Sequence, residues 1–166
     1  QDGFREFRAE PADGGDVRDR RPREPSHGAE TPQQLLLAAR ADAGDLRGLS
    51  AAACQQPISS AMLVGGSTQL GASARLVLTN PGETTASVSI TGWGATGPLP
   101  DIAPLVVPAG GVRTLLLETV SLDERIAIRI DVVGGRVVPS IQDTSLNGLI
   151  AAGTEMIGVT ANPADE

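Results

Sequence analysis

The chain has 166 residues, a formal net charge of −7 and a sequence pI near 4.7. This acidic balance argues against nucleic acid or an anionic membrane surface as a partner, since both carry negative charge. The length suits one domain with an extension, and no apolar run approaches the roughly 18–20 residues that cross a bilayer. The start of the chain also lacks the basic and then apolar pattern of a signal peptide.

Residues 1–30 carry many charges of both signs, with Gly and Pro interspersed. Such a segment buries too little apolar surface to offset its ordering entropy, so we expect it to be flexible. Residues 31–57 are expected to form a linker with one short element. Thr31-Pro32-Gln33-Gln34 resembles a capping box and predicts a helix over Leu35–Ala41, while the apolar run Leu35–Leu37 is also compatible with a strand.

Residues 58–160 form a run of short alternating segments divided by Gly/Pro turns such as Asn80-Pro81-Gly82. In the strongest segment β-branched residues alternate with Arg129 and Asp131, which predicts a strand with one apolar and one polar face. The predicted strands are Ala61–Val64, Leu76–Thr79, Ala86–Thr91, Leu105–Val107, Val112–Glu118, Ile126–Val132 and Arg136–Ile141.

Seven short strands over roughly 100 residues predict an all-β fold, an immunoglobulin-like antiparallel β-sandwich, with a barrel as the alternative. Gly134-Gly135 predicts a tight hairpin between the last two of these strands, because glycine tolerates the positive φ of such turns. Pro139 has no N–H, which places its strand at a sheet edge or a bulge. Residues 146–157 suggest a loop and a closing strand, and residues 161–166 a tail.

No residue pattern in the chain indicates catalysis, a cofactor or a metal, so we expect no enzyme activity. His27 is the only histidine and lies in the charged segment, which leaves a nucleophile without a positioned base and zinc without enough ligands. Gly92–Gly97 has the letters of a dinucleotide fingerprint, but prolines follow where a helix would have to begin. Asp123-Glu124 are expected to lie in a solvated turn, and adjacent carboxylates would point apart on a strand, unlike the facing pair of a glycosidase.

Four residues remain as possible ligand contacts. Trp93, flanked by glycines near a strand end, could stack on a sugar ring or could instead cover the core as a lid. Arg129, Asp131 and Gln142 could line one polar sheet face, either as a ligand platform or as a solvated surface. Cys54 is the only cysteine, so it pairs with a cysteine outside this chain, stays free, or packs as a small apolar residue.

A set of phrases in fixed order resembles the C-terminal half of an actinobacterial family of exported, envelope-associated proteins described only as a domain of unknown function. The resemblance runs from about Gly44 to Glu166. The phrases that carry it are Gly44-Asp45-Leu46-Arg47-Gly48-Leu49, Ala53-Cys54-Gln55-Gln56-Pro57, Leu63-Val64-Gly65-Gly66-Ser67-Thr68, Leu76-Val77-Leu78-Thr79-Asn80-Pro81-Gly82, and Gln142-Asp143 through Gly148-Leu149 to Gly153-Thr154.

The resemblance implies an extracytoplasmic location, an upstream domain outside this chain and a possible disulfide partner there for Cys54. Met62 departs from it, since an aromatic residue is expected at that position. The function we expect is a non-enzymatic module that binds an envelope glycan or protein, or acts as a spacer. The alternatives are a protein–protein module that uses a sheet edge, and an accessory part of a glycan-processing protein. The oligomeric state stays open.

Overall fold

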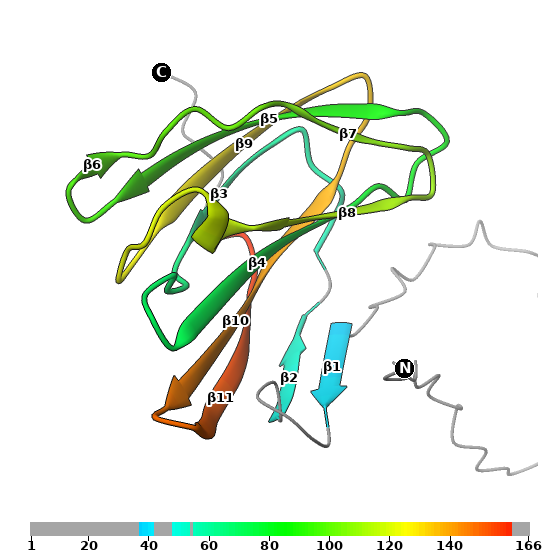
Figure 1. Ribbon diagram of the computed structural model, residues 1–166. Coiled ribbons are helices and arrows are strands. Elements are labelled where there is room, and N and C mark those ends of the chain that lie inside the picture. The colour runs from blue at the N-terminus through cyan, green and yellow to red at the C-terminus, as the bar shows by residue number, and fades with distance from the viewer. Residues whose placement is uncertain (1–36, 42–47, 54, 161–166) are drawn as a thin grey trace, which may run out of the picture. The chain divides into compact units, whose positions relative to one another are not determined.

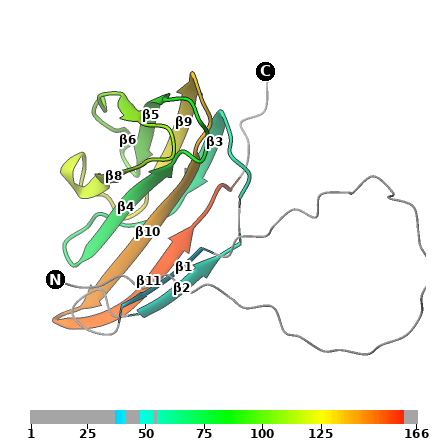
Figure 2. The ribbon, with the colours of Figure 1, turned by 90° about the vertical axis from the view of Figure 1, so that its right-hand side faces the viewer.

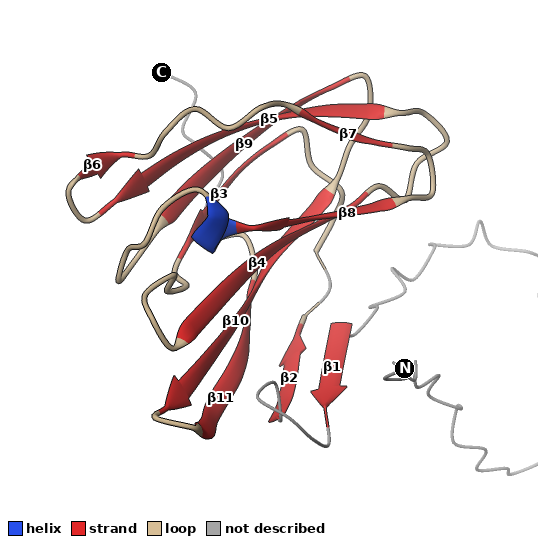
Figure 3. Ribbon diagram, viewed as in Figure 1, coloured by secondary structure: helices blue, strands red, loops and turns tan. Residues whose placement is uncertain are grey.

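The computed structural model describes residues 37–41, 48–53 and 55–160, all within one compact unit that spans residues 35–166. The strands are β1 (Leu37–Ala41), β2 (Gly48–Ala52), β3 (Ser60–Val64), β4 (Ala72–Thr79), β5 (Ala86–Gly94), β6 (Gly97–Pro98), β7 (Leu105–Val107), β8 (Val112–Leu116), β9 (Ala127–Val133), β10 (Val138–Asn147) and β11 (Ile150–Ile157). A single 3-10 turn, η1 (Leu117–Thr119), is the helical element of the described residues (Figure 3).

The strands from β3 onward form two antiparallel sheets packed face to face (Figure 1). One sheet has the order β3-β9-β5-β6, with β7 also paired to β5, and is called the five-stranded sheet. The other has the order β11-β10-β4-β8 and is called the four-stranded sheet. Two separate layers confirm the predicted antiparallel β-sandwich over the barrel. All seven predicted strands are present, and β11 is the closing strand suggested after them.

The core lies between the two sheets because side chains alternate along each strand. In β9, Ile128 and Ile130 are fully buried, while Arg129 between them points to solvent. From the four-stranded sheet, Leu76 and Leu78 of β4 meet them with no exposed surface. The core is almost entirely aliphatic, which agrees with a sequence that has only 2% aromatic residues.

Three connections pass from one sheet to the other at the same end of the sandwich: residues 80–85, 108–111 and 134–137. The third corrects a prediction, because Gly134-Gly135 does not close a hairpin: β9 and β10 belong to different sheets. Gly134 has φ +87°, and a Cβ on Gly135 would lie 3.2 Å from the carbonyl oxygen of Thr84. The glycines therefore let this connection pass close to the one between β4 and β5.

Asn80 joins these connections from inside the fold. Its side chain is fully buried, and its Nδ2 donates hydrogen bonds to the carbonyl oxygens of Thr84 (2.8 Å) and Val107 (3.1 Å). Its Oδ1 accepts from the N–H of Gly82 (3.0 Å), and its own N–H donates to the carbonyl of Gly111 (2.9 Å). One amide thus satisfies backbone groups from both sheets, which would otherwise be buried without partners.

The opposite end of the sandwich has a second polar connection, between Thr68 and Asp123. Thr68 is 1% exposed; its N–H donates to the carbonyl of Asp123 (2.9 Å), and its Oγ1 accepts from the N–H of Asp123 (2.8 Å). The carboxylate of Asp123 accepts from the N–H of Ala95 (3.1 Å) and the hydroxyl of Ser121 (2.7 Å). Asp123 therefore lies in a turn, as predicted, and holds the loops of this end together.

The prediction that Pro139 marks a sheet edge or a bulge is wrong, since it lies in β10, between β4 and β11, in regular pairing with β4. Val137, two residues earlier, exchanges both of its backbone hydrogen bonds with Ile58, on the side of β10 away from β4. Residues two apart direct their backbone groups the same way, so the nitrogen of Pro139 also faces that side. The pairing with β11 begins only at Ile141, so the missing N–H costs no ladder bond.

Residues 37–41 form strand β1, paired antiparallel with β2, so the helix predicted over Leu35–Ala41 is wrong in this part. Of the alternative strand at Leu35–Leu37, only Leu37 lies in the described residues, and it begins β1. The proposed capping box at residues 31–34 lies outside the described residues. Strand β2 lies beside β11 (Figure 2). A Cβ on Gly48 would come within 2.7 Å of the side chain of Thr154, so the hairpin packs closely on the outer face of the four-stranded sheet.

We expect Asn80→Ala to lower the free energy of unfolding by about 3 kcal/mol, because it leaves buried carbonyl groups unpaired and opens a small cavity. Urea unfolding followed by the fluorescence of Trp93, the only tryptophan, measures this change. Asn147→Ala is the control, since Asn147 is exposed at the end of β10 and its loss should cost less than about 0.5 kcal/mol. Equal stabilities of the two variants would contradict the role given to Asn80.

Candidate functional site

The outer face of the five-stranded sheet carries exposed polar side chains of three neighbouring strands together with Trp93 and two exposed valines, Val64 (53%) and Val133 (74%). The register places Trp93 of β5 between Ala127 of β9 and Pro98 of β6. The next row on this face aligns Met62, Arg129 and Thr91, and the row after it aligns Ser60, Asp131 and Ser89. Two of the four predicted contact residues, Arg129 and Asp131, therefore share one surface with Trp93.

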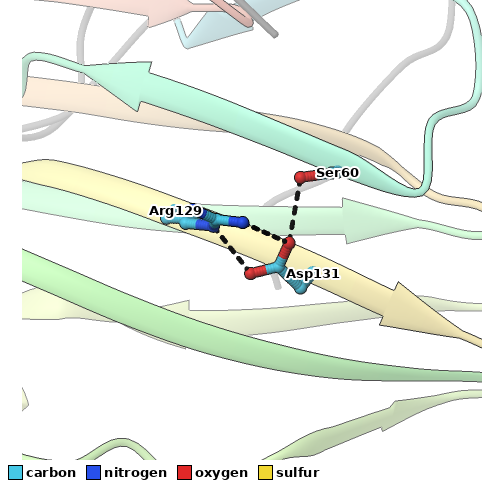
Figure 4. Close-up of polar contacts among 3 residues, drawn as sticks. All are labelled: Ser60, Arg129 and Asp131. Carbon is cyan, nitrogen blue, oxygen red and sulfur yellow. Dashed lines mark hydrogen bonds and ion pairs between the residues drawn. The ribbon is translucent and has the colours of Figure 1, made fainter. Parts of the chain in front are cut away.

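Arg129 and Asp131 form an ion pair along β9, with Nε of Arg129 2.9 Å from Oδ2 of Asp131 (Figure 4). The hydroxyl of Ser60, on the adjacent strand β3, donates to Oδ1 of the same carboxylate at 2.9 Å. Both charged side chains are nearly half exposed, at 45% and 44%. The network fixes the two side chains in place while leaving them open to a ligand.

The hydrogen bond from Arg129 lowers the pKa of Asp131 below its ordinary value, and the bond from Ser60 acts in the same direction, while burial opposes both. The same contact raises the pKa of Arg129. Both groups are therefore charged at neutral pH, and their charges cancel. A surface of this kind offers hydrogen-bond donors and acceptors without net charge, which suits an uncharged polar ligand.

Trp93 lies on the outer face of β5, because the strand alternates and Ile90 and Gly92 point inward. It is 37% exposed and does not belong to the core cluster, so the lid interpretation is wrong. Arg129 is its diagonal neighbour, a position within reach of long side chains. Asp131 is four residues beyond Ala127, or about 13 Å along the strand. A ligand that contacts both Trp93 and Asp131 must be longer than a single sugar ring.

Gln142 does not share this face. It lies on β10 in the four-stranded sheet, paired with Arg75 on one side and Met156 on the other. Asp143, its neighbour, lies on the inward side of β10 under the loop of residues 65–68, where Oδ1 accepts from the N–H of Ser67 (3.2 Å). Burial raises the pKa of Asp143, and the charge of Glu155 adds to the increase, while the bond from Ser67 opposes it.

The remaining candidates do not form a site in the described residues. Gly92 and Gly94 lie at the end of β5, and strand β6 follows instead of the helix that dinucleotide binding needs. A Cβ at Gly92 would meet Leu99, and one at Gly94 would meet Asp123, so packing explains both glycines. No group of three or more potential metal ligands occurs in the described ranges. Cys54 and His27 lie outside those ranges.

Sequence reasoning missed Ser60, Met62 and Thr91 as members of the face. Their strands were predicted, and the alternation of Ser60 and Met62 with buried Ala61 and Leu63 was visible in the sequence. The strand order β3-β9-β5 could not be read from the sequence. Only that order brings these residues beside Arg129. Met62, where the resemblance implied an aromatic residue, lies directly opposite Arg129.

The two packed sheets make this part of the chain a β-sandwich domain, and the outer face of its five-stranded sheet is open. In the part of the chain that the structure describes, no helix has the length and apolar character to span a membrane. A model of a family of unknown function, DUF5719, matches residues 23–166, and the chain belongs to this family. The match confirms the resemblance to a family of unknown function and extends it upstream of Gly44. No curated protein matches the chain.

Among solved structures, the Anabaena sensory rhodopsin transducer is similar with a TM-score of 0.45 and 15% sequence identity. The match covers 53% of this chain and 98% of that chain.

We expect Asp143→Asn to raise the free energy of unfolding at pH 7. The raised pKa means that the folded protein binds more protons than the unfolded chain above about pH 4, so the Asp143 contribution falls as pH rises through that window. The amide keeps an oxygen that can accept from the N–H of Ser67. Because it is uncharged, it avoids the cost of removing a charged carboxylate from water. Urea unfolding at several pH values between 3 and 7 measures the difference between variant and parent.

The gain from Asp143→Asn should shrink toward zero below about pH 4, where the parent carboxyl is also neutral. Glu155→Gln is a matched second variant, since it removes the neighbouring charge and should reproduce part of the gain. A variant less stable than the parent at pH 7 would contradict the assignment of Asp143 as a desolvated carboxylate.

Proposed function

We propose that this domain is a non-catalytic, extracytoplasmic module of an actinobacterial envelope protein, and that it binds an uncharged envelope glycan through the outer face of the five-stranded sheet. The observation that carries the proposal is the position of Trp93 on that face, 37% exposed and diagonal to Arg129. The resemblance in the sequence supports the exported location, and family membership assigns no activity that competes with it.

Aromatic rings bind the apolar face of a sugar, while planar polar side chains bind its hydroxyl groups. Trp93 supplies the first element. Asp131 and Arg129 supply acceptors and donors already held in place by Ser60, so little ordering entropy is lost on binding. Because the charges of the pair cancel, the surface favours a neutral glycan over an acidic one.

We expect the parent chain to co-sediment with cell-wall material of its source organism and Trp93→Ala to bind about tenfold more weakly, since a central aromatic contact is commonly worth that much. Arg129→Ala should weaken binding as well, because it removes a donor from the face and leaves Asp131 held by Ser60 alone. The bound fraction is measured over a range of wall concentrations. Circular dichroism checks that each variant keeps its fold.

Two variants serve as controls for this experiment. Gln142→Ala removes the predicted contact that lies in the other sheet, and Leu149→Ala removes an apolar side chain that is 96% exposed in the turn between β10 and β11. Both should bind like the parent. If the parent does not sediment, direct glycan binding by this domain is wrong and a spacer role replaces it.

A second candidate function is pairing with another protein through a sheet edge. The edge first expected at Pro139 does not exist, and Val137 beside it is fully buried. One edge of the four-stranded sheet is β8, whose Val112 and Leu116 are 50% and 38% exposed, and the other edge is β11. Arg113 lies on the inward side of β8, opposite Leu78, and a charge in that position disfavours edge pairing. We therefore rank this candidate second.

If β8 pairs with a second copy of the chain, Thr114→Pro should convert a dimer to a monomer. The carbonyl of Gly111 accepts from the N–H of Asn80, so the backbone groups of Gly111 face β4. Backbone groups alternate in direction along a strand, so those of Val112 and Thr114 face away from β4, toward the unpaired side of β8. Proline at residue 114 thus removes an outward donor and spares the bonds to β4. Analytical ultracentrifugation measures the mass, and a parent that is monomeric at every concentration rules out this self-pairing.

A further inference from the structure

An open pocket lies at the end of the sandwich organised by Asn80, beside two of the three connections between the sheets. It is lined by residues from the connections at 80–85 and 134–137 and by Pro57, and its volume is about 680 Å³. This volume falls in the range of small-molecule sites. The pocket is formed by the sheet connections and Pro57, and none of the residues of the glycan face lines it.

One wall of the pocket is a stretch of backbone with unused donors. Gly134, Gly135 and Arg136 follow one another along this wall, and none of their N–H groups donates a hydrogen bond to another described residue. Gly134 has φ +87°, in the left-handed region. Consecutive N–H groups around a left-handed residue form a concave surface that binds anions.

Arg136 is the only ionisable residue among those that line the pocket. It is exposed, and no described carboxylate lies within ion-pair distance of its guanidinium. Glu83 is near in sequence to Pro81 and Gly82, but it does not line the pocket. In a chain with a net charge of −7, an arginine beside free N–H groups makes a local positive site.

The other walls are apolar or hydroxylated. Two prolines, Pro57 and Pro81, and one hydroxyl-bearing residue, Thr84, are among its lining residues. A guanidinium binds a carboxylate through two parallel hydrogen bonds, and proline rings pack against a short carbon skeleton. We infer that this pocket binds a small carboxylic acid or the carboxylate end of a larger ligand, with the carboxylate on Arg136 and its carbon atoms against Pro57 and Pro81.

The probe for this site is propionate, titrated into the full ¹⁵N-labelled chain and followed by amide chemical shifts. The neutral isostere propionamide is the matched ligand, because it has the same carbon skeleton without the charge. We expect saturable shifts at Gly134, Gly135 and Arg136 with propionate only. Arg136→Gln should weaken propionate binding about tenfold or more, since it removes a charged hydrogen-bonding partner.

Arg125→Gln is the control variant, since Arg125 is exposed in the connection at the opposite end of the sandwich, and it should bind like the parent. Inorganic phosphate, titrated in parallel, should bind more weakly because it cannot use the proline walls. The inference is overturned if propionate gives no saturable shifts, if propionamide gives the same ones, or if they persist in Arg136→Gln. Stronger binding of phosphate would equally overturn the carboxylate assignment. Loss of wall binding by Trp93→Ala leaves this test unaffected, so the two proposals fail separately.

Discussion

The two sheets of this domain are held in register at one end by a single buried amide. Asn80 donates to Thr84 and Val107 and accepts from Gly82, so it closes the connections that carry the chain between the sheets. A core of aliphatic side chains fixes how far apart two sheets lie but not how they are aligned, because apolar packing is not directional. The buried amide supplies directional bonds, and Thr68 with Asp123 does the same at the other end. Everything placed on the sheets depends on this alignment.

Local pattern predicted the strands well. Ile126–Val132 shows why: its alternation of isoleucine with Arg129 and Asp131 reports directly which side chains face the core. Gly134-Gly135 shows where the pattern fails, since a glycine pair between two strands fits both a hairpin and a crossing, and only the sheet that each strand joins decides. Pro139 misled for a related reason. Its missing N–H rules out one hydrogen bond but does not reveal that β11 ends before reaching it.

The candidate face was predicted in part. Arg129 and Asp131 come from one strand, so their shared face follows from a spacing of two residues. Trp93 joins them only because β5 lies beside β9, and Gln142 is excluded only because β10 lies in the other sheet. Strand order depends on contacts between residues far apart in the chain, such as Ser60 and Asp131, which are 71 positions apart. A single sequence contains no signal for such pairs, and the same holds for the pocket at Arg136.

Because β2 packs against β11, the two outer faces of the sandwich differ in how accessible they are. The outer face of the four-stranded sheet is occupied there: Ser140 and Thr144, which point outward from β10, are only 8% and 7% exposed. The outer face of the five-stranded sheet keeps Trp93 and Arg129 accessible. If the domain binds a polymer as proposed, the polymer can lie along only one of its two flanks, the one that carries Trp93 and Arg129.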